Sequence, residues 1–286
     1  MTEHVRKPEW LKVNFGANER YTETKKIVDG HCLHTICSSG RCPNIGECWG
    51  RGTATFMIGG DICTRACKFC NTKSGRPMPL DPAEPANVAR SIALMRLRYA
   101  VVTSVDRDDL PDLGAAHWVA TIREIKAAAP ATALEVLIPD FQGHDELLDM
   151  IADARPDVVS HNIETVRRIT PTVRSRADYA TSLHVLARLA SRGMTVKSGL
   201  MVGLGETVAE VEETMDDLLA NGCSIITIGQ YLQPTHRHHP VHEYVTPAQF
   251  EAYKATALAK GFKEVESAPL VRSSYRADKH LDRAAR

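Results

Sequence analysis

The fold and chemistry of this chain are decided by one stretch, Gly59-Gly60-Asp61-Ile62-Cys63-Thr64-Arg65-Ala66-Cys67-Lys68-Phe69-Cys70. Its cysteines have the spacing Cys-x3-Cys-x2-Cys, so that one loop can direct three sulfurs at a common centre. Thiolates select zinc, copper(I) or iron–sulfur clusters. A four-iron cube held by three thiolates keeps one iron open for chemistry. The loop therefore predicts a catalytic cluster, with a zinc site or three buried thiols as the alternatives; zinc sites usually pair Cys-x2-Cys units.

The composition is that of an ordinary globular protein. The 286 residues are 43% hydrophobic and 24% charged, and the formal net charge is zero. The length suits one large domain with extensions or two smaller ones, and the charge balance predicts no nucleic-acid or membrane partner. No apolar run approaches the roughly 20 residues of a membrane span, and the first twelve residues lack the apolar core of a signal peptide. We expect a cytoplasmic protein, whose eight cysteines would stay reduced and available for metals.

A second group of cysteines precedes the first. Residues 31–50 contain Cys32, Cys37, Cys42 and Cys48, separated by glycines and a proline. Such segments indicate turns and neither helix nor strand. Four cysteines in one short polar segment predict a second metal site. Residues 1–30 are polar and are expected to form an extension over a larger body.

From residue 54 onward, apolar runs alternate with segments of helical periodicity, which predicts parallel βαβ units. The expected strands are 54–58, 99–103, 134–138, 157–160, 196–202 and 224–228, and the expected helices are 84–98, 115–129, 143–154, 178–192, 206–221 and 246–260. Six units are too few for a closed eightfold barrel. We predict an α/β fold with a partial, TIM-like (β/α)6 barrel; a doubly wound sheet is the second choice.

Polar residues and glycines follow the expected strands, where the active site of such a barrel gathers. Candidate cofactor-binding residues at or after these strands are Thr103, Asp106, Asn162, Glu164, Lys197, Gly203, Gly205, Glu206 and Gln230. Asn162 and Glu164 could bind ribose hydroxyls, and Lys197 could meet a carboxylate; ordinary strand-end polar residues are the alternative for each. The acidic turn 106–109 suggests magnesium, but the intervening Arg107 and the lack of a phosphate loop argue against it. The histidines at 236, 238 and 239 are interpreted as a polar loop, and Cys223 as a buried thiol.

Several motifs together resemble the lipoyl synthase family of the radical S-adenosylmethionine (SAM) superfamily over nearly the whole chain. The glycine-rich stretch 199–206 is similar to the strand that supports adenine and ribose in that superfamily. The resemblance also rests on five motifs, which are residues 33–37, Cys42-Pro43-Asn44-Ile45-Gly46-Glu47-Cys48-Trp49, residues 54–60, residues 106–110 and Arg272-Ser273-Ser274-Tyr275.

The resemblance implies two [4Fe–4S] clusters with different roles. Cys63, Cys67 and Cys70 would hold the cluster that binds SAM. An auxiliary cluster, with Cys37, Cys42, Cys48 and Ser274 as ligands, would supply sulfur. The implied reaction inserts two sulfurs at C6 and C8 of an octanoyl group on a carrier-protein lysine, because a radical can break a C–H bond that acid–base catalysis cannot. The partners would be an octanoylated carrier, of the E2 lipoyl-domain or glycine-cleavage H-protein type, and a low-potential donor such as ferredoxin or flavodoxin.

The predicted organisation has three parts: an N-terminal extension (1–52), the barrel (53–262) and a C-terminal segment (263–286), with both extensions covering the active face. Three residues depart from the family pattern. Cys32 has no family role, Leu113 stands where a glycine is usual, and Ser74 replaces a commoner threonine. The alternatives are another sulfur-inserting radical SAM enzyme, such as a biotin-synthase-like or methylthiolating one, and a non-catalytic module stabilised by zinc at residues 32–48.

Overall fold

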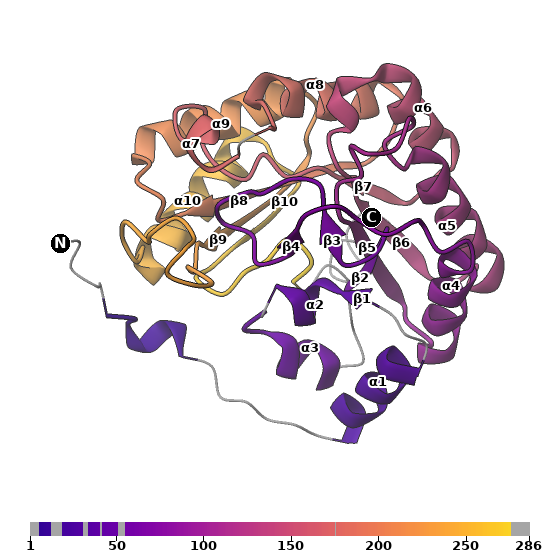
Figure 1. The fold of residues 1–286 in the computed structure, drawn as a ribbon. Helices are drawn as coiled ribbons and strands as arrows, with labels where there is room; N and C mark the ends of the chain where they lie inside the picture. Colours follow the sequence, from indigo (N-terminus) through magenta and orange to yellow (C-terminus); the bar gives the residue numbers. More distant parts are fainter. Residues whose placement is uncertain are drawn as a thin grey trace.

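The computed structural model describes residues 6–12, 19–30, 34–40, 42–50, 55–174 and 176–275 (Figure 1). Cys32, one of the cysteines in question, lies outside these ranges. In the described ranges, seven cysteines are present and all are free thiols.

A curved sheet of eight strands forms the centre of the described structure. Its spatial order is β1-β2-β5-β6-β7-β8-β9-β10, with β1 antiparallel to β2 and every later neighbour parallel. The strands are β1 (His34–Thr35), β2 (Thr55–Ile58), β5 (Tyr99–Ser104), β6 (Ala133–Leu137), β7 (Val158–Ser160), β8 (Val196–Val202), β9 (Ile225–Gln230) and β10 (Glu264–Ser267). The parallel strands follow one another without the reversal of order that a doubly wound sheet requires. The partial barrel is therefore the correct architecture, and it stays open between β1 and β10.

Six long helices pack on the outer face of the curved sheet, so that the strands lie inside a layer of helices as in a barrel (Figure 1). They are α4 (Glu84–Met95), α5 (Ala115–Ala128), α6 (Asp145–Asp153), α8 (Tyr179–Ser191), α9 (Val208–Ala220) and α10 (Pro247–Lys260). All six match predicted helices. Their ends follow local chemistry: Thr207 and Glu210 form a capping box on α9, and Gly261 ends α10 in the left-handed conformation.

The prediction that residues 31–50 contain neither helix nor strand is wrong. This segment contains β1, the short helix α2 (Ile36–Ser39) and α3 (Ile45–Gly50). The Thr35 side chain caps α2 by accepting a hydrogen bond from the Ser38 amide, and Gly40 ends the helix. The glycines and proline mark the ends of these elements. A further helix, α1 (Glu19–Gly30), and the seventh parallel strand, β10, were also not predicted.

The shorter elements complete the described chain. They are β3 (Ile62–Cys63), β4 (Lys73–Ser74), α7 (Thr170–Val173) and the 3-10 turns η1 (Glu9–Leu11) and η2 (Phe141–Gly143). β3 and β4 pair in parallel and frame the cysteine loop.

Leu113, which stands in place of the usual glycine, keeps the backbone conformation that glycine favours. Its φ is 52°, in the left-handed region, and Gly114 follows with φ 87°. A leucine there costs about 1 kcal/mol or more in backbone strain. The side chain packs against the main core, which offsets part of that cost. The turn therefore has, at position 113, the left-handed backbone that a glycine would favour.

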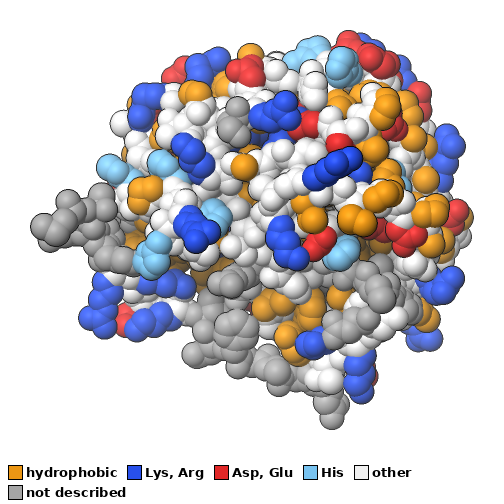
Figure 2. Space-filling view, viewed as in Figure 1, with side chains coloured by type: hydrophobic (Ala, Val, Ile, Leu, Met, Phe, Trp, Pro, Cys, Tyr) orange, Lys and Arg blue, Asp and Glu red, His pale blue; other side chains and the backbone are white. Residues whose placement is uncertain are grey.

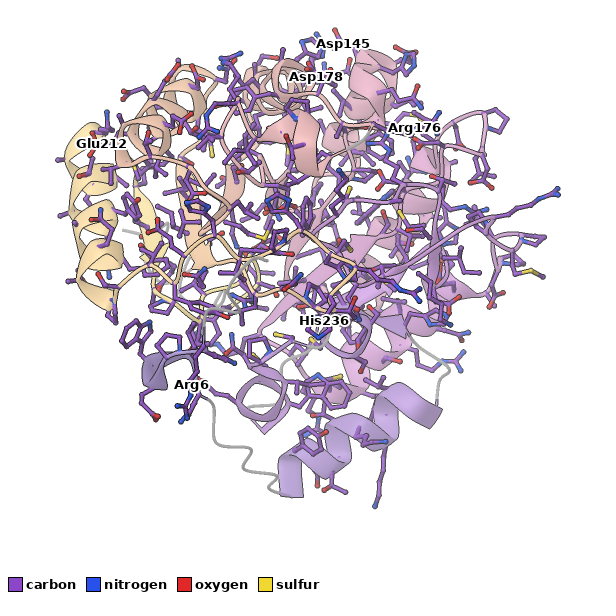
Figure 3. The ribbon with its side chains drawn as sticks, turned by 60° about the vertical axis from the view of Figure 1, so that its left-hand side comes forward. Arg6, Asp145, Arg176, Asp178, Glu212 and His236 are labelled. Carbon is purple, nitrogen blue, oxygen red and sulfur yellow. The ribbon has the colours of Figure 1, made fainter. Side chains whose placement is uncertain are left out.

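The surface carries both signs of charge. Figure 2 shows Lys and Arg side chains spread over one face with Asp and Glu side chains among them. In Figure 3, Asp145, Asp178 and Glu212 lie toward the outer helices, away from Arg6 and His236. Within the described ranges, no helix has the length and apolar character that a membrane span requires.

Candidate cluster-binding active site

A cavity of about 500 Å³ opens at the carboxyl ends of the parallel strands. It is lined by the loop cysteines and by strand-end residues, among them Cys63, Cys67, Cys70, Thr103, Asp106, Asn162, Glu164 and Gln230. Ile36 and Pro43 from the N-terminal part, and Arg272 and Ser273 from the C-terminal part, also line it. Both ends of the described chain therefore reach the active face.

The cysteine loop is fixed by the backbone and carboxylate of Asp106. The Cys63 thiol donates to Asp106 Oδ2 over 3.4 Å, and its sulfur accepts from the amides of Asp106 and Arg65 at 3.3 and 3.4 Å. Burial, together with the charge of Asp106, raises the pKa of Cys63 to about 12. Burial likewise raises the pKa of Cys67 to about 12. Binding of a metal as thiolates must therefore release protons from this loop.

The donor set of this loop fits an iron–sulfur cluster. Three thiols line one cavity, and three thiolates on one loop are a set of soft donors that suits such a cluster. In the described part of the chain, no three His, Cys, Asp or Glu side chains converge closely enough to hold a single metal ion. A cubane cluster does not require the three sulfurs to meet at one point, because each thiolate binds a different iron. The sulfurs need only face the same cavity.

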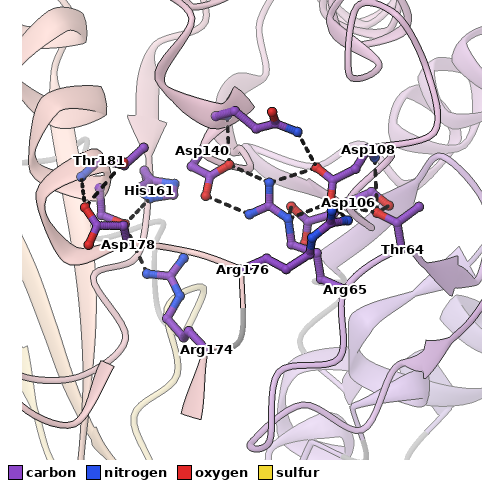
Figure 4. A network of polar contacts seen from close by, with 12 residues as sticks. Thr64, Arg65, Asp106, Asp108, Asp140, His161, Arg174, Arg176, Asp178 and Thr181 are labelled. Atoms are coloured by element: carbon purple, nitrogen blue, oxygen red, sulfur yellow. Dashed lines mark hydrogen bonds and ion pairs between the residues drawn. The ribbon is translucent and has the colours of Figure 1, made fainter. Parts of the chain in front are cut away.

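Arg65, inside the cysteine motif, organises three carboxylates beneath the loop (Figure 4). Its guanidinium makes paired hydrogen bonds of 2.6–2.9 Å to both Asp108 and Asp140, and Nε lies 3.4 Å from Asp106 Oδ1. Burial opposes ionisation of Asp140, but the hydrogen bonds and charge of Arg65 outweigh it and lower its pKa to about 2. For Asp106 burial dominates and the pKa is raised, despite the opposing charge of Arg65. The acidic turn is thus an arginine-binding structure, which agrees with its rejection as a magnesium site.

Arg174 brings a positive charge to the cavity, and the sequence analysis did not find it. Its Nη1 donates to Ser182 Oγ at 3.0 Å, and His161 Nε2 lies 3.0 Å from the same oxygen. His161 Nδ1 must donate to the carbonyl of Ile138, because a carbonyl only accepts. Burial lowers the pKa of His161 to about 4, which agrees with a neutral ring accepting the Ser182 proton. The chain of hydrogen bonds from Arg174 through Ser182 to His161 fixes the Arg174 guanidinium. Its buried Nε has no partner among the described residues.

Asn162 and Glu164 lie beside each other on the cavity wall after β7. Asn162 Nδ2 donates to Glu164 Oε1 at 3.1 Å, while its own Oδ1 is buried without a partner in the described structure. Glu164 has φ 68°, and its backbone bridges to β8, so this segment is held in an unusual conformation. A side chain at Gly199 would come within 2.6 Å of Asn162 Oδ1. An unused acceptor in the cavity wall is suited to a ligand hydroxyl.

The structure does not support Lys197 as a ligand-binding residue. It is fully buried in β8, and its ammonium lies 2.9 and 3.0 Å from the two oxygens of Glu135 in β6. Tyr99 and Ser160 complete the shell with 2.7 Å hydrogen bonds to the same carboxylate. Lys197 does meet a carboxylate, but an internal one across neighbouring strands, and it does not line the cavity.

We expect Lys197→Met to lower the free energy of unfolding of the apoprotein by about 3–5 kcal/mol, because it leaves Glu135 buried and unpaired. Urea denaturation measures this effect. The double variant Lys197→Met/Glu135→Leu should recover most of the loss and, once reconstituted, should bind SAM as tightly as wild type. Severalfold weaker SAM binding by a stable double variant would return Lys197 to the site.

The glycine-rich turn and Gln230 have internal roles. Glu206 accepts hydrogen bonds from the amides of Gly203 and Leu204, which closes the turn after β8. The two N–H bonds of the Gln230 amide are shared among three carbonyls within 3.2 Å, and its oxygen accepts from the Val245 amide, so its side chain is fully used. A side chain at Gly203 would approach Gln230 Nε2 within 2.2 Å. Gly203, Gly205 and Glu206 do not line the cavity.

The histidine segment predicted as a polar loop contacts the cysteine loop. His238 Nε2 lies 2.9 Å from the carbonyl of Cys70, and the His239 amide donates to the carbonyl of Lys68 at 2.8 Å. Tyr231 donates to the His239 carbonyl at 2.6 Å. Residues 235–239, which follow β9 in the chain, therefore hold the end of the cysteine motif. Cys223, as predicted, is a buried thiol.

The second cysteine group lies next to the C-terminal segment. Asn44 donates to the Leu270 carbonyl at 2.7 Å, and Thr55 Oγ1 donates to Ser274 Oγ at 2.8 Å. Thr55 is also within reach of the buried Cys37 thiol; burial raises the pKa of Cys37, and Thr55 partly opposes this effect. Thr55 therefore links the positions of Cys37 and Ser274, which are 237 residues apart in the numbering (274 − 37).

Comparison with known proteins agrees with this geometry. Residues 57–218, more than half of the chain, match the radical SAM superfamily. The chain is 72% identical to a lipoyl synthase of Bacteroides fragilis over 97% of this chain and 96% of that protein. It is also 72% identical to a lipoyl synthase of Bacteroides thetaiotaomicron, over 98% of this chain and the whole of that protein.

Solved structures show the same fold at low identity. SuiB of Streptococcus suis, bound to S-adenosylmethionine, has a TM-score of 0.59 at 10% identity and covers 79% of this chain and 55% of its own. The hydrogenase maturase HydG of Carboxydothermus hydrogenoformans has a TM-score of 0.55 at 12% identity, with 93% and 78% covered. The full-length matches to lipoyl synthases favour that family over both alternatives, a zinc-stabilised module and another sulfur-inserting subfamily. The chain belongs to the lipoyl synthase family of the radical SAM superfamily.

Proposed function

We propose that this enzyme inserts two sulfur atoms, at C6 and C8, into an octanoyl group carried on a protein lysine, using the two cysteine groups for two separate clusters. Membership of a family of radical SAM sulfur-inserting enzymes implies SAM and one [4Fe–4S] cluster. The division of residues between two clusters is our assignment. The observation that carries it is the position of the cavity, which is lined by one cysteine group and by the sequence neighbours of the other.

The SAM cluster is assigned to Cys63, Cys67 and Cys70. Arg174 is the proposed partner of the SAM carboxylate, in place of Lys197, because it lines the cavity and its Nε is not engaged by the described residues. Asn162 Oδ1 is the proposed acceptor for a ribose hydroxyl, supported by its lack of a partner in the same ranges. Glu164 is its neighbour on the same wall, where burial raises the carboxyl pKa against the opposing effect of Arg174.

The auxiliary cluster is assigned to Cys37, Cys42, Cys48 and Ser274. The hydrogen bond from Thr55 to Ser274 supports this assignment, since it holds the hydroxyl oxygen close to the Cys37 thiol. Ser273, the residue before Ser274 in the sequence, lines the cavity.

When bound, the first cluster and SAM supply a radical that removes hydrogen from carbon, and the second cluster supplies sulfur. The chain itself orients these groups. Arg65 and Asp106 position the cysteine loop, and residues 235–239 hold its far end. Residues of both extensions line the cavity. The proposed partners are an octanoylated carrier of the E2 lipoyl-domain or H-protein type and a ferredoxin or flavodoxin.

Iron counting tests the assignment of two clusters. The Cys63→Ala/Cys67→Ala/Cys70→Ala variant, reconstituted anaerobically, should keep about half of the wild-type iron and sulfide, because the auxiliary site has its own four ligands. A matched variant with Cys37, Cys42 and Cys48 changed to alanine should keep the other half. Loss of all iron from either well-folded variant would show that the cysteine groups do not bind separate clusters.

A further inference from the structure

A hydrogen bond joins the two segments that carry the cysteine groups. The side-chain amide of Asn71, the residue after Cys70, donates to the backbone carbonyl of Ser39 at 2.8 Å. Ser39 is the last residue of α2 and lies between Cys37 and Cys42 in the sequence. Asn71 also lines the cavity. The contact therefore lies at the proposed active site, between the two sets of proposed cluster ligands.

The end of the cysteine loop is held firmly where Asn71 leaves it. The Lys68 amide donates to the Val173 carbonyl at 2.8 Å. The Cys70 carbonyl, directly before Asn71, lies 2.9 Å from His238 Nε2. These contacts come from two other parts of the barrel, so the Asn71 side chain starts from a fixed point.

The segment around α2 has a shorter attachment to the sheet. It follows β1, which pairs with β2 over two residues only. Within the segment, the Gly40 amide donates to the Ile36 carbonyl at 2.8 Å, and the Cys42 amide donates to the Cys37 carbonyl at 3.0 Å. These internal bonds make α2 and its two flanking cysteines move together. A hydrogen bond at Ser39 therefore positions Cys37 and Cys42 relative to the cysteine loop.

The proposed reaction depends on this relative position. The substrate carbon loses hydrogen at the SAM site and must then meet sulfur held by the other cysteine group. A displacement of about 1 Å between reacting groups can lower a rate about 100-fold. The contact that fixes the two segments should therefore decide how many cleaved SAM molecules lead to sulfur transfer.

We propose that Asn71 tethers the auxiliary segment to the SAM-cluster loop and thereby fixes the separation of the two clusters. This inference rests on the proposed function, with its two clusters. Asn71 is a positioning residue, because it acts through the carbonyl of Ser39. Loss of the tether leaves both clusters bound and SAM cleavage active, but it separates cleavage from sulfur transfer.

The test compares Asn71→Leu with wild type, both reconstituted anaerobically. Leucine has nearly the shape of asparagine, and it removes the donor without adding a charge near the clusters. With both clusters reduced, pulsed electron paramagnetic resonance measures the dipolar interaction between their spins. We expect a broader distribution of distances between the clusters at equal iron content, and about tenfold more deoxyadenosine per thiolated product.

Ser39→Ala is the matched control. It removes the Ser39 hydroxyl, with its contacts to the Thr35 carbonyl and Met57 sulfur, but keeps the backbone carbonyl that Asn71 uses. This variant should have the distance distribution and the product ratio of wild type. If Asn71→Leu does not fold, Asn71→Ala takes its place, because it adds no bulk at this half-buried position.

Three results would overturn the inference and leave the proposed function intact. They are a wild-type distance distribution or product ratio in a folded Asn71 variant, equal changes in Ser39→Ala, and loss of iron from the Asn71 variant. Wild-type protein with the iron and sulfide of one cluster only would refute the proposal of two clusters, and the inference with it.

Discussion

A Cys63→Ala variant should produce no deoxyadenosine from SAM under reducing conditions. Of the three loop cysteines in the described structure, Cys63 has the most hydrogen bonds at its sulfur, which bonds to the Asp106 carboxylate and to the amides of Arg65 and Asp106. Loss of a direct ligand should exceed the about 10- to 100-fold effects of losing outer partners of a metal site. Chromatography of the nucleoside products measures this loss.

The matched control is Cys42→Ala, in the other cysteine group. It should still cleave SAM to a measurable extent while forming no thiolated product, because the proposed sulfur source is damaged and the proposed SAM site is not. Equal loss of deoxyadenosine in both variants would count against separate roles for the two groups.

The Ser274→Cys variant should retain its auxiliary cluster and cleave SAM, but it should stall in sulfur transfer at or before the second insertion. A serine oxygen is a harder donor and suits iron less well than a thiolate. In the structure, the Ser274 oxygen accepts a 2.8 Å hydrogen bond from Thr55, which would weaken its donation to iron further. A thiolate at position 274 would bind the fourth iron of the proposed cluster more strongly, so that this iron would be released less easily.

Anaerobic reaction with an octanoyl-lysine peptide provides the measurement, with unmodified, singly and doubly thiolated products scored by mass. Ser273→Ala is the control, because Ser273 lines the cavity but is not the proposed ligand. Wild-type yields of the doubly thiolated product from Ser274→Cys would refute the proposal that a weak bond between Ser274 and iron is required for sulfur transfer. If Ser273→Ala lowered the yield of thiolated product more than Ser274→Ala, the ligand would be assigned to Ser273 and not to Ser274.

The six predicted strands and helices could be recognised because each is a buried apolar run or a clear helical period. β10 could not, since Glu264 and Glu266 alternate with buried residues in a segment only four residues long. The short helices between residues 36 and 50 were missed because glycine and proline mark the ends of helices as well as loops. Propensity alone does not separate these two uses.

The site was predictable where chemistry is local in sequence and was missed where it depends on packing. The spacing of the loop cysteines and the position of Asp106 just after β5 can both be read directly from a short segment of the sequence. Asp140 follows β6 in the same way, and the strand-end rule would have found it. Arg174 gives no such signal, because its role comes from the relay through Ser182 and His161. The ion pair of Lys197 was not foreseen because no local feature reveals that Glu135 faces it across the sheet.

The contact between Thr55 and Ser274 also sets an order of events during protein synthesis. The two residues are 219 positions apart, and Asn44 is 226 positions from its partner Leu270. At about 5–20 residues per second, the ribosome completes the second half of these pairs about 10–45 s after the first. Asn44 and Thr55 are therefore made long before the C-terminal segment that they bind. Their hydrogen bonds to Leu270 and Ser274 are absent during that interval and are among the last long-range contacts that the chain can form.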